Sequence, residues 1–179
     1  IMRERGIRQL PVVDSNKKVL GVLTWDVIVR DRSEETMVVM MAGGIGSRLR
    51  PLTENTPKPL LPIANKMTLG YAFDQLVDCG IREICIVVGE NEAQVREALG
   101  DGGQFGVQLS YVKQTEPKGL AHAVGFAEEF VGDRDFLLYL GDAIYGSSLK
   151  PFVDRFLESG CANLNLVKPV DGSKGWLVA

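Results

Sequence analysis

Residues 37–53 read MVVMMAGGIGSRLRPLT, an apolar run that passes directly into a glycine-rich loop. A buried strand followed by glycines leaves backbone N–H groups uncovered, and without Cβ atoms in the way an anionic group can approach those amides closely. Arg48 and Lys58 place positive charge on either side of this loop. The whole chain has a net charge of -3, yet basic residues outnumber acidic ones between Arg48 and Lys66. The stretch therefore predicts a phosphate-binding loop at the end of a buried strand.

Apolar runs alternate with helical spacing along the rest of the chain. The runs at 84–88 and 136–140 are nearly continuous, which is typical of strands covered on both faces. This alternation predicts an α/β fold with a doubly wound, mostly parallel sheet, in which ligands bind at the carboxyl ends of the strands. The loop at 42–47 and Gly141-Asp142 are therefore expected to face one pocket. We expect strands at 37–41, 84–88, 108–113, 136–140 and 162–168, and helices at 67–79, 91–99, 119–130 and 148–159.

The first 31 residues have a different sequence pattern from the rest of the chain. A short helical pattern ends near Gly6, and two apolar runs at 9–14 and 19–24 flank a polar turn, which predicts a helix followed by a β-hairpin. A charged link comes next. We therefore expect three parts, which are residues 1–31, a linker at 32–36 and an α/β domain at 37–179.

Composition places the chain among ordinary soluble globular proteins, with 45% hydrophobic and 24% charged residues in 179. No basic stripe indicates nucleic-acid binding, and no apolar run approaches the roughly 18 residues of a membrane helix. Cys79, Cys85 and Cys161 are odd in number and lack metal-site spacing, so we expect buried thiols in a reducing compartment. These features predict a cytoplasmic protein that binds neither nucleic acid nor membrane.

The glycine-rich loop alone leaves several nucleotide-binding motifs open. Gly44-x-Gly46 matches part of a dinucleotide fingerprint, but Leu49 stands where the third glycine belongs, and the sequence has no GxxxxGK[ST] signature. The longer string AGGIGSRLRPLTENTPKPLLP, at 42–62, resembles the signature of the sugar-1-phosphate nucleotidylyltransferases. Two further blocks resemble this family in the same order, QTEPKGLAHA at 114–123 and YLGD at 139–142.

This resemblance implies a Rossmann-like nucleotide-binding fold and a set of site residues. Arg48 would neutralise the departing pyrophosphate, Lys58 would lie beside the phosphate under attack, and Asp142 would ligate Mg²⁺. Backbone amides of the loop would hold the phosphates, and Gln114 with the Gly119 backbone would hydrogen-bond the base. The implied nucleotide-binding residues are Ala42, Gly43, Gly44, Gly46, Gln114 and Gly119.

Each of these residues also has an ordinary structural interpretation. Arg48 and Lys58 would then be solvated surface charges. Asp142 would be a cap or turn residue, and Gln114 would lie on the surface of an edge strand. His122, the sole histidine, is expected to pack or hydrogen-bond beside the pocket instead of acting as a base, because the attacking sugar phosphate is already anionic.

The activity that the resemblance implies is transfer of a nucleoside monophosphate from a nucleoside triphosphate to a sugar 1-phosphate, with release of pyrophosphate. dTTP or UTP is favoured, GTP is a third option, and glucose 1-phosphate is the favoured acceptor. The alternative is a non-catalytic module that binds a nucleotide or a nucleoside-diphosphate sugar and regulates a partner. The partners are then these small molecules, and assembly into a homo-oligomer stays open.

The two ends of the chain bear on this expectation. Residues 6–14 and 21–24 resemble the second half of a cystathionine-β-synthase-type (CBS) motif, but Thr24-Trp25-Asp26 is one residue shorter than the Thr-x-x-Asp ending of that family. Such a fragment would be a regulatory nucleotide site or a hairpin packed on the domain or on a neighbouring chain. Family members have a second lobe with sugar contacts and a second Mg²⁺-binding aspartate, so a chain that stops at Ala179 is expected to be truncated at its C-terminus.

Overall fold

A four-stranded parallel sheet forms the centre of the computed structural model, which describes residues 5–24 and 36–167. The strand order is β7-β6-β3-β8, and every neighbouring pair runs parallel. Four of the expected strands are thereby confirmed, and so is the parallel α/β sheet. Their bounds are β3 (Met37–Met41), β6 (Glu83–Val88), β7 (Gln108–Lys113) and β8 (Phe136–Leu140).

The central strand β3 sets where the loops begin. It pairs with β6 on one side and β8 on the other, and Met41 lies opposite both Val87 and Leu140. The three strands therefore end at one level. The chain passes from β3 to β6 and β7 in one direction and then returns to β8 on the other side of β3. A reversal of this kind opens a crevice between the carboxyl ends of the two strands that flank it, here β3 and β8.

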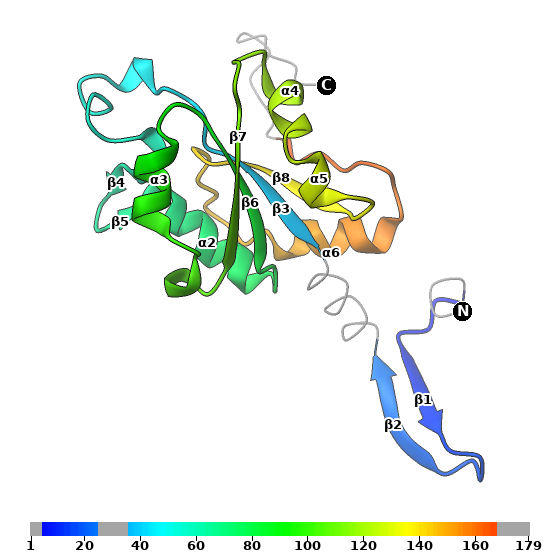
Figure 1. Ribbon diagram of the computed structural model, residues 1–179. Helices are drawn as coiled ribbons and strands as arrows, with labels where there is room; N and C mark the ends of the chain where they lie inside the picture. The colour runs from blue at the N-terminus through cyan, green and yellow to red at the C-terminus, as the bar shows by residue number, and fades with distance from the viewer. Residues whose placement is uncertain (1–4, 25–35, 168–179) are drawn as a thin grey trace, which may run out of the picture.

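Helices cover both faces of the sheet, which confirms the doubly wound arrangement (Figure 1). Side chains of a strand alternate between faces. Val38 and Met40 pack in one buried cluster with α2 (Thr68–Asp78), α3 (Glu92–Leu99) and α6 (Lys150–Ser159). Met37 and Val39 pack in a second cluster with α4 (Leu120–Gly125) and α5 (Glu128–Val131). In the described ranges, no helix is long and apolar enough to cross a membrane.

Two expected elements differ from the structure. The helix expected at 119–130 is two helices, α4 and α5, because the chain leaves helical geometry at Ala127, two residues after Gly125, a residue type that weakens helices. The strand expected at 162–168 is wrong within 162–167, which are irregular and mostly exposed; Lys168 lies outside the described residues. A strand needs a neighbour to satisfy its backbone groups, and no described strand pairs with this segment.

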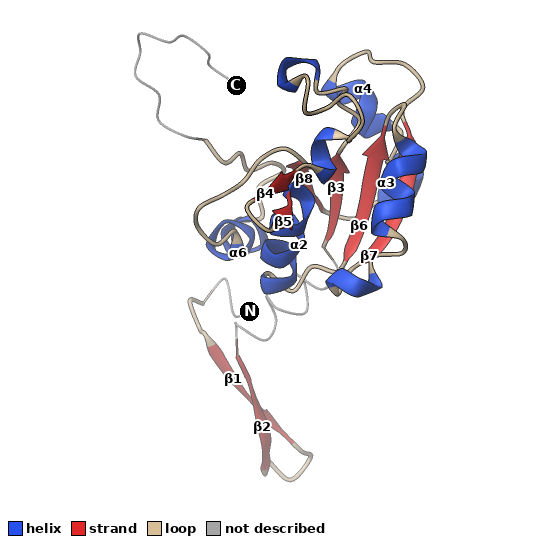
Figure 2. Cartoon of the chain, turned by 90° about the vertical axis from the view of Figure 1, so that its left-hand side faces the viewer, coloured by secondary structure: helices blue, strands red, loops and turns tan. Residues whose placement is uncertain are grey.

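The loop after β3 contains short elements that the sequence did not predict. Two 3-10 helices, η1 (Ser47–Leu49) and η2 (Lys58–Leu60), shape the loop. A small antiparallel pair, β4 (Pro62–Ile63) and β5 (Lys66–Met67), then leads into α2. A third 3-10 helix, η3 (Gly103–Phe105), precedes β7. Figure 2 shows β4 and β5 beside α2.

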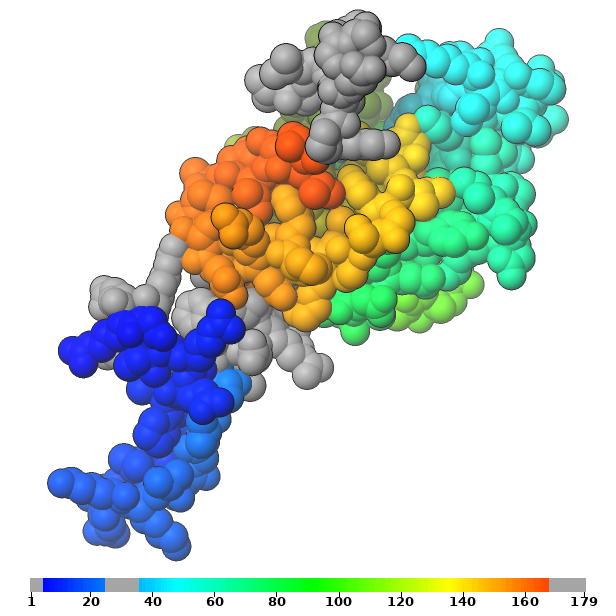
Figure 3. Space-filling view, turned by 180° about the vertical axis from the view of Figure 1, so that it is seen from behind, coloured from blue at the N-terminus to red at the C-terminus, as the bar shows by residue number. Residues whose placement is uncertain are grey.

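The expected hairpin near the N-terminus is present as β1 (Gln9–Val13) and β2 (Val19–Thr24), paired antiparallel. The Asp14 carboxylate accepts the N–H groups of Asn16 and Lys18 and closes the turn. The hairpin projects from the rest of the described chain (Figure 3), and most of its side chains are exposed. The helix expected before Gly6 falls largely on residues 1–4, outside the described residues.

The cysteines are unpaired, and one of them corrects the sequence-based expectation. Cys79 and Cys85 are buried, and burial raises the pKa of each thiol to about 11, so both stay protonated at neutral pH. Cys161 is exposed, because it follows the end of α6 in the irregular segment described above. The expectation of three buried thiols is therefore wrong for Cys161.

Contact between strand ends predicts the effect of one substitution. A Cβ on Gly89, directly after β6, would lie 2.7 Å from the carbonyl oxygen of Gly43, a backbone atom that cannot turn away. Gly89→Ala should lower the free energy of unfolding by about 1–3 kcal/mol, as overpacking does. Denaturant-induced unfolding measures this change.

The matched control is Gly125→Ala on α4, where a Cβ would meet no atom within 4 Å. This variant should be as stable as the parent or slightly more stable, because alanine favours helix over glycine. Equal stability of the two variants would contradict the close contact between residues 43 and 89.

Candidate active site

Three loops meet at the carboxyl edge of the sheet and enclose a pocket of about 610 Å³. They follow β3, β7 and β8, three strands whose ends are far apart in sequence. The pocket lies over the crevice between β3 and β8. All the site residues expected from the sequence line it, which are Ala42, Gly43, Gly44, Gly46, Arg48, Lys58, Gln114, Gly119 and Asp142.

Backbone contacts between neighbouring strand ends hold these loops together. The Gly141 N–H donates to the Met41 carbonyl at 2.9 Å, and a Cβ on Gly141 would lie 2.7 Å from the same oxygen. On the other side of β3, Gly43 touches Gly89 in the same way. Side chains at these positions would separate the loops. Glycine is therefore needed for close approach, and this brings Asp142 next to the loop after β3.

The loop at 43–47 offers unused backbone donors. None of the described residues accepts a hydrogen bond from the N–H groups of 43–47, although residues 43–47 line the pocket. Gly46 has φ 68° and ψ 24°, a left-handed conformation that begins η1, and its carbonyl accepts the Leu49 N–H at 2.9 Å. Ala42 differs from the glycines, because its own N–H donates to the Val87 carbonyl at 2.9 Å. Ala42 therefore lines the pocket without offering an amide.

The two expected cationic residues occupy different environments. Arg48 is exposed on η1 and lines the pocket. Lys58 begins η2 between Pro57 and Pro59, which are both buried and restrict the backbone on either side of it. The Lys58 ammonium forms an ion pair with the Asp142 carboxylate, across 84 positions of sequence. The structure thus joins one predicted catalytic residue to the predicted metal ligand.

Asp142 stands at the end of β8 with 47% of its side chain exposed. The loop after it is fixed by Tyr139, whose hydroxyl donates to the Ala143 carbonyl at 3.1 Å, and by Gln75 of α2, whose amide donates to the Tyr145 carbonyl at 2.7 Å. Burial raises the pKa of the Tyr139 hydroxyl, so it remains a donor. The carboxylate is therefore presented on a supported turn.

The donors available for a metal fit one kind of ion. In the part of the chain that the structure describes, no group of three or more His, Cys, Asp or Glu side chains converges on a point. A site made of one carboxylate cannot enclose Zn²⁺, which takes three or four protein ligands. Mg²⁺ is commonly held by one or two carboxylates together with substrate phosphates and water. Asp142 beside a loop with unused amide donors fits that pattern.

Gln114 and Gly119 form the third side of the pocket. The Gln114 N–H donates to the Val88 carbonyl at 2.9 Å, which keeps the residue in line with β7, and its side-chain amide donates to the Glu116 carbonyl at 3.0 Å. Its Oε1 lies against Gly43, 3.3 Å from where a Cβ there would stand. Gly119, with φ 97°, begins α4. A planar polar side chain therefore lies directly beside the glycine-rich loop.

Several pocket residues were not singled out from the sequence. They form its apolar wall and lie within the three recognised motifs, so their place in a motif was the available signal. His122 does not line the pocket; it packs edge-on against Phe126 at 5.1 Å between ring centroids, which agrees with a packing residue beside the site. The apolar wall residues are Ile45, Leu49, Pro59, Pro117, Leu120, Ala123 and Leu140.

Comparisons with known proteins match this architecture. A family model described as nucleotidyl transferase matches residues 37–174, and a CBS domain model matches residues 1–34. The low-salt glycan biosynthesis nucleotidyltransferase Agl11 of Haloferax volcanii is 47% identical over 123 residues, which are 68% of this chain and 34% of that protein. The UTP–glucose-1-phosphate uridylyltransferase AglF of the same organism is 41% identical over 133 residues, 74% of this chain and 54% of that protein.

A solved structure agrees with these relatives. A Bacillus anthracis protein assigned as a glucose-1-phosphate thymidylyltransferase is similar with a TM-score of 0.64 and 37% identity, over 68% of this chain and 50% of that one. The chain thus spans between 34% and 54% of the length of these proteins. Since the nucleotidyl transferase model covers most of the chain and relatives of this kind share its sequence and fold, the chain belongs to the nucleotidyl transferase family.

Proposed function

We propose that the protein transfers a nucleoside monophosphate from a nucleoside triphosphate to a sugar 1-phosphate. The observation that carries this proposal is the convergence of unused loop amides, two cations and one carboxylate on a single pocket at the β3–β8 crevice. Nucleotidyl transfer depends mainly on positioning and on neutralising phosphate charge, and these groups supply both. The relatives described above are named for reactions of this class.

The proposed reaction is an in-line displacement at the α-phosphorus. An oxygen of the sugar 1-phosphate forms the new bond to phosphorus, while the bond from phosphorus to the oxygen that bridges to the β-phosphate breaks. Pyrophosphate leaves with that electron pair, and a nucleoside-diphosphate sugar remains. No protein group needs to remove a proton, because the attacking oxygen is already anionic. The protein's part is therefore electrostatic and geometric.

The residues of this chain divide that work. Amides of the loop at 43–47 bind phosphate oxygens, Arg48 offsets the charge that develops on the leaving pyrophosphate, and Lys58 lies beside the phosphate under attack. Asp142 would hold Mg²⁺, which as a Lewis acid would supply positive charge to the phosphates. Gln114 and the Gly119 backbone bind the base. The ion pair between Lys58 and Asp142 opens when substrates enter, because each partner then has its own ligand.

The favoured substrates are dTTP or UTP and glucose 1-phosphate, with GTP as a further option. Relatives named for thymidylyl and for uridylyl transfer both match this chain, which supports a pyrimidine nucleotide. Gln114 supports either pyrimidine, because its amide carries both a donor and an acceptor.

A pyrophosphate-release assay tests the activity. dTTP, UTP and GTP are each combined with Mg²⁺ and a panel of sugar 1-phosphates that includes glucose 1-phosphate. We expect turnover to be fastest with dTTP or UTP and to stop when EDTA removes the metal. Nucleotide binding by calorimetry without turnover for any pair would overturn the enzymatic proposal and would support the alternative, a non-catalytic nucleotide-binding module.

Arg48→Ala should lower kcat by about 10²–10³-fold, the effect of removing one donor that stabilises charge in the transition state. Arg48 is exposed, so the free energy of unfolding should change little. Steady-state kinetics and denaturant unfolding give the two measurements. Arg50→Ala is the matched control, because Arg50 is exposed in the same loop but does not line the pocket. Equal losses in the two variants would refute a specific role for Arg48.

Asp142→Asn should lower kcat by at least about 100-fold and raise the Mg²⁺ concentration needed for half-maximal rate, because a neutral amide is a poorer Mg²⁺ ligand than a carboxylate. The variant should stay folded, since the ion pair it breaks is partly exposed and contributes about 1 kcal/mol or less. Activity is measured against Mg²⁺ concentration.

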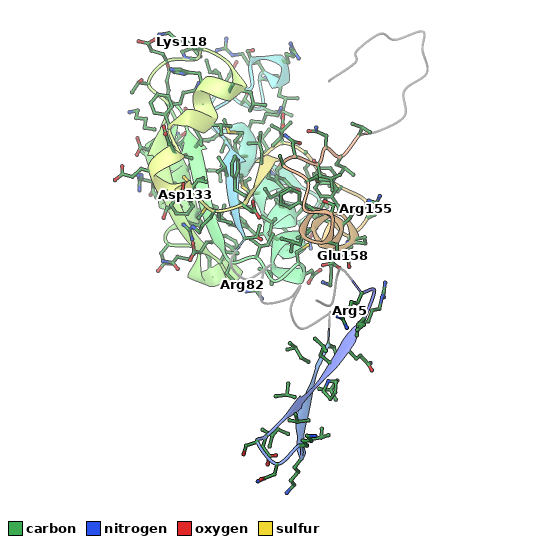
Figure 4. The ribbon with its side chains drawn as sticks, turned by 90° about the vertical axis from the view of Figure 1, so that its right-hand side faces the viewer. Arg5, Arg82, Lys118, Asp133, Arg155 and Glu158 are labelled. Atoms are coloured by element: carbon green, nitrogen blue, oxygen red, sulfur yellow. The ribbon has the colours of Figure 1, made fainter. Side chains whose placement is uncertain are left out.

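Asp133→Asn is the control for this substitution. Asp133 lies after α5, at the other end of the α4–α5 segment from Lys118 (Figure 4), and it does not line the pocket. Its Mg²⁺ dependence should match that of the parent. An unchanged Mg²⁺ requirement in Asp142→Asn would contradict the metal-binding role.

A further inference from the structure

Thr53 holds the glycine-rich loop without lining the pocket. It lies seven residues after Gly46, and its hydroxyl donates to the Gly46 carbonyl at 2.8 Å. Its methyl carbon would be 2.9 Å from a Cβ built on Gly46, so it packs directly against the Gly46 backbone. Thr53 therefore contacts Gly46 through both its hydroxyl and its methyl group.

Two hydrogen bonds fix one peptide group of the loop. The Gly46 carbonyl accepts from the Thr53 hydroxyl and from the Leu49 N–H, which uses both of its lone pairs. The peptide group is planar and trans, so the Ser47 N–H must point away from the side on which Thr53 lies. Ser47 is the first residue of η1, where an N–H has no acceptor within the helix, and it lines the pocket.

The hydrogen bond from Thr53 matters because Gly46 has a left-handed backbone conformation. Glycine visits many backbone conformations at little cost, so an unheld Gly46 would let the loop rearrange. Lys58 packs on the same point, with its Cβ 3.2 Å from the position of a Cβ on Gly46. Gly46 is thus enclosed between Thr53 and Lys58, and the segment 53–58 fixes the loop amides and the Lys58 backbone together.

We infer that Thr53 is a positioning residue for phosphate binding: its hydroxyl and methyl hold the Gly46–Ser47 peptide in the orientation that presents the Ser47 amide to a nucleotide phosphate. This inference rests on the proposed function, because it assumes that the loop receives a nucleoside triphosphate. Thr53 acts through Gly46 and does not touch the substrate.

The test compares ligands with and without phosphates. Thr53→Val keeps the shape and removes the hydroxyl. It should raise the dissociation constant of the preferred triphosphate, dTTP or UTP, by about fivefold, within the range for one lost hydrogen bond. The dissociation constant of the corresponding nucleoside, thymidine or uridine, should stay within about twofold. Calorimetry measures the triphosphate, and NMR titration measures the weaker nucleoside.

Two further variants separate positioning from a general structural effect. Thr53→Ser retains the hydroxyl and should bind the triphosphate within about twofold of the parent. Thr56→Val makes the same chemical change three residues on, at a threonine whose hydroxyl bonds to no described residue, and should leave both affinities unchanged. In steady-state assays, KM for the triphosphate should rise in Thr53→Val more than kcat falls.

The outcomes are distinct. Unchanged triphosphate affinity in Thr53→Val, or an equal loss for triphosphate and nucleoside, would overturn the positioning role while leaving the proposed function standing. Failure of the parent protein to bind any of dTTP, UTP and GTP would instead overturn the proposed function, and the role of Thr53 with it.

Discussion

Contact between backbones at the carboxyl end of β3 is the constraint on which the site depends. Gly43 touches Gly89 after β6, and Gly141 after β8 touches the Met41 carbonyl. These approaches leave no room for a Cβ, so the loops after three strands begin within van der Waals contact of one another. Because β3 is fully buried from Met37 to Met40, the level of these contacts is fixed by the core. A pocket made of distant sequence segments thus has a rigid base.

One cation of the pocket is paired with its carboxylate, and Arg48 adds a second positive charge. Lys58 and Asp142 neutralise each other, whereas the amides at 43–47 have no acceptor among the described residues. In the proposed reaction, the unused donors would receive phosphate oxygens, and the opened ion pair would leave one cation for a phosphate and one carboxylate for a metal. Since the pair is partly exposed, the cost of opening it is about 1 kcal/mol or less. Pre-positioned amides and a weak ion pair are compatible with the proposed exchange of highly charged substrates.

Sequence patterns predicted the parts of this structure that burial and periodicity control. β3 and β6 are nearly continuous apolar runs because both of their faces are covered. Strands that run parallel end at one edge of the sheet, which placed Gly43 and Asp142 in one pocket. The segment at 162–167 alternates apolar and polar residues but pairs with no strand among the described residues. The helix expected at 119–130 is interrupted at Ala127, two residues after Gly125. Both depend on neighbours that a pattern does not record.

The candidate site, like the fold, was predicted from the sequence only in part. Motif spacing located the expected residues, but it did not predict that Ala42 uses its own N–H in the sheet, that Lys58 pairs with Asp142, or that Thr53 supports Gly46. Each of these is a contact that forms only when separate segments meet in the folded chain. The domain boundaries and the roles of the site residues remain predictions.

The hairpin β1–β2 is largely exposed, and none of its residues belongs to the buried core of the domain. Val19, Leu20 and Val22 are 59%, 67% and 57% exposed, so the hairpin adds little apolar burial to the core of the domain. A two-stranded hairpin with uncovered apolar side chains is marginally stable by itself in water. The loops that form the pocket follow β3, β7 and β8, and no residue of the hairpin lines it. Any influence of the region matched by the CBS model on that pocket would therefore have to act through contacts outside the pocket lining.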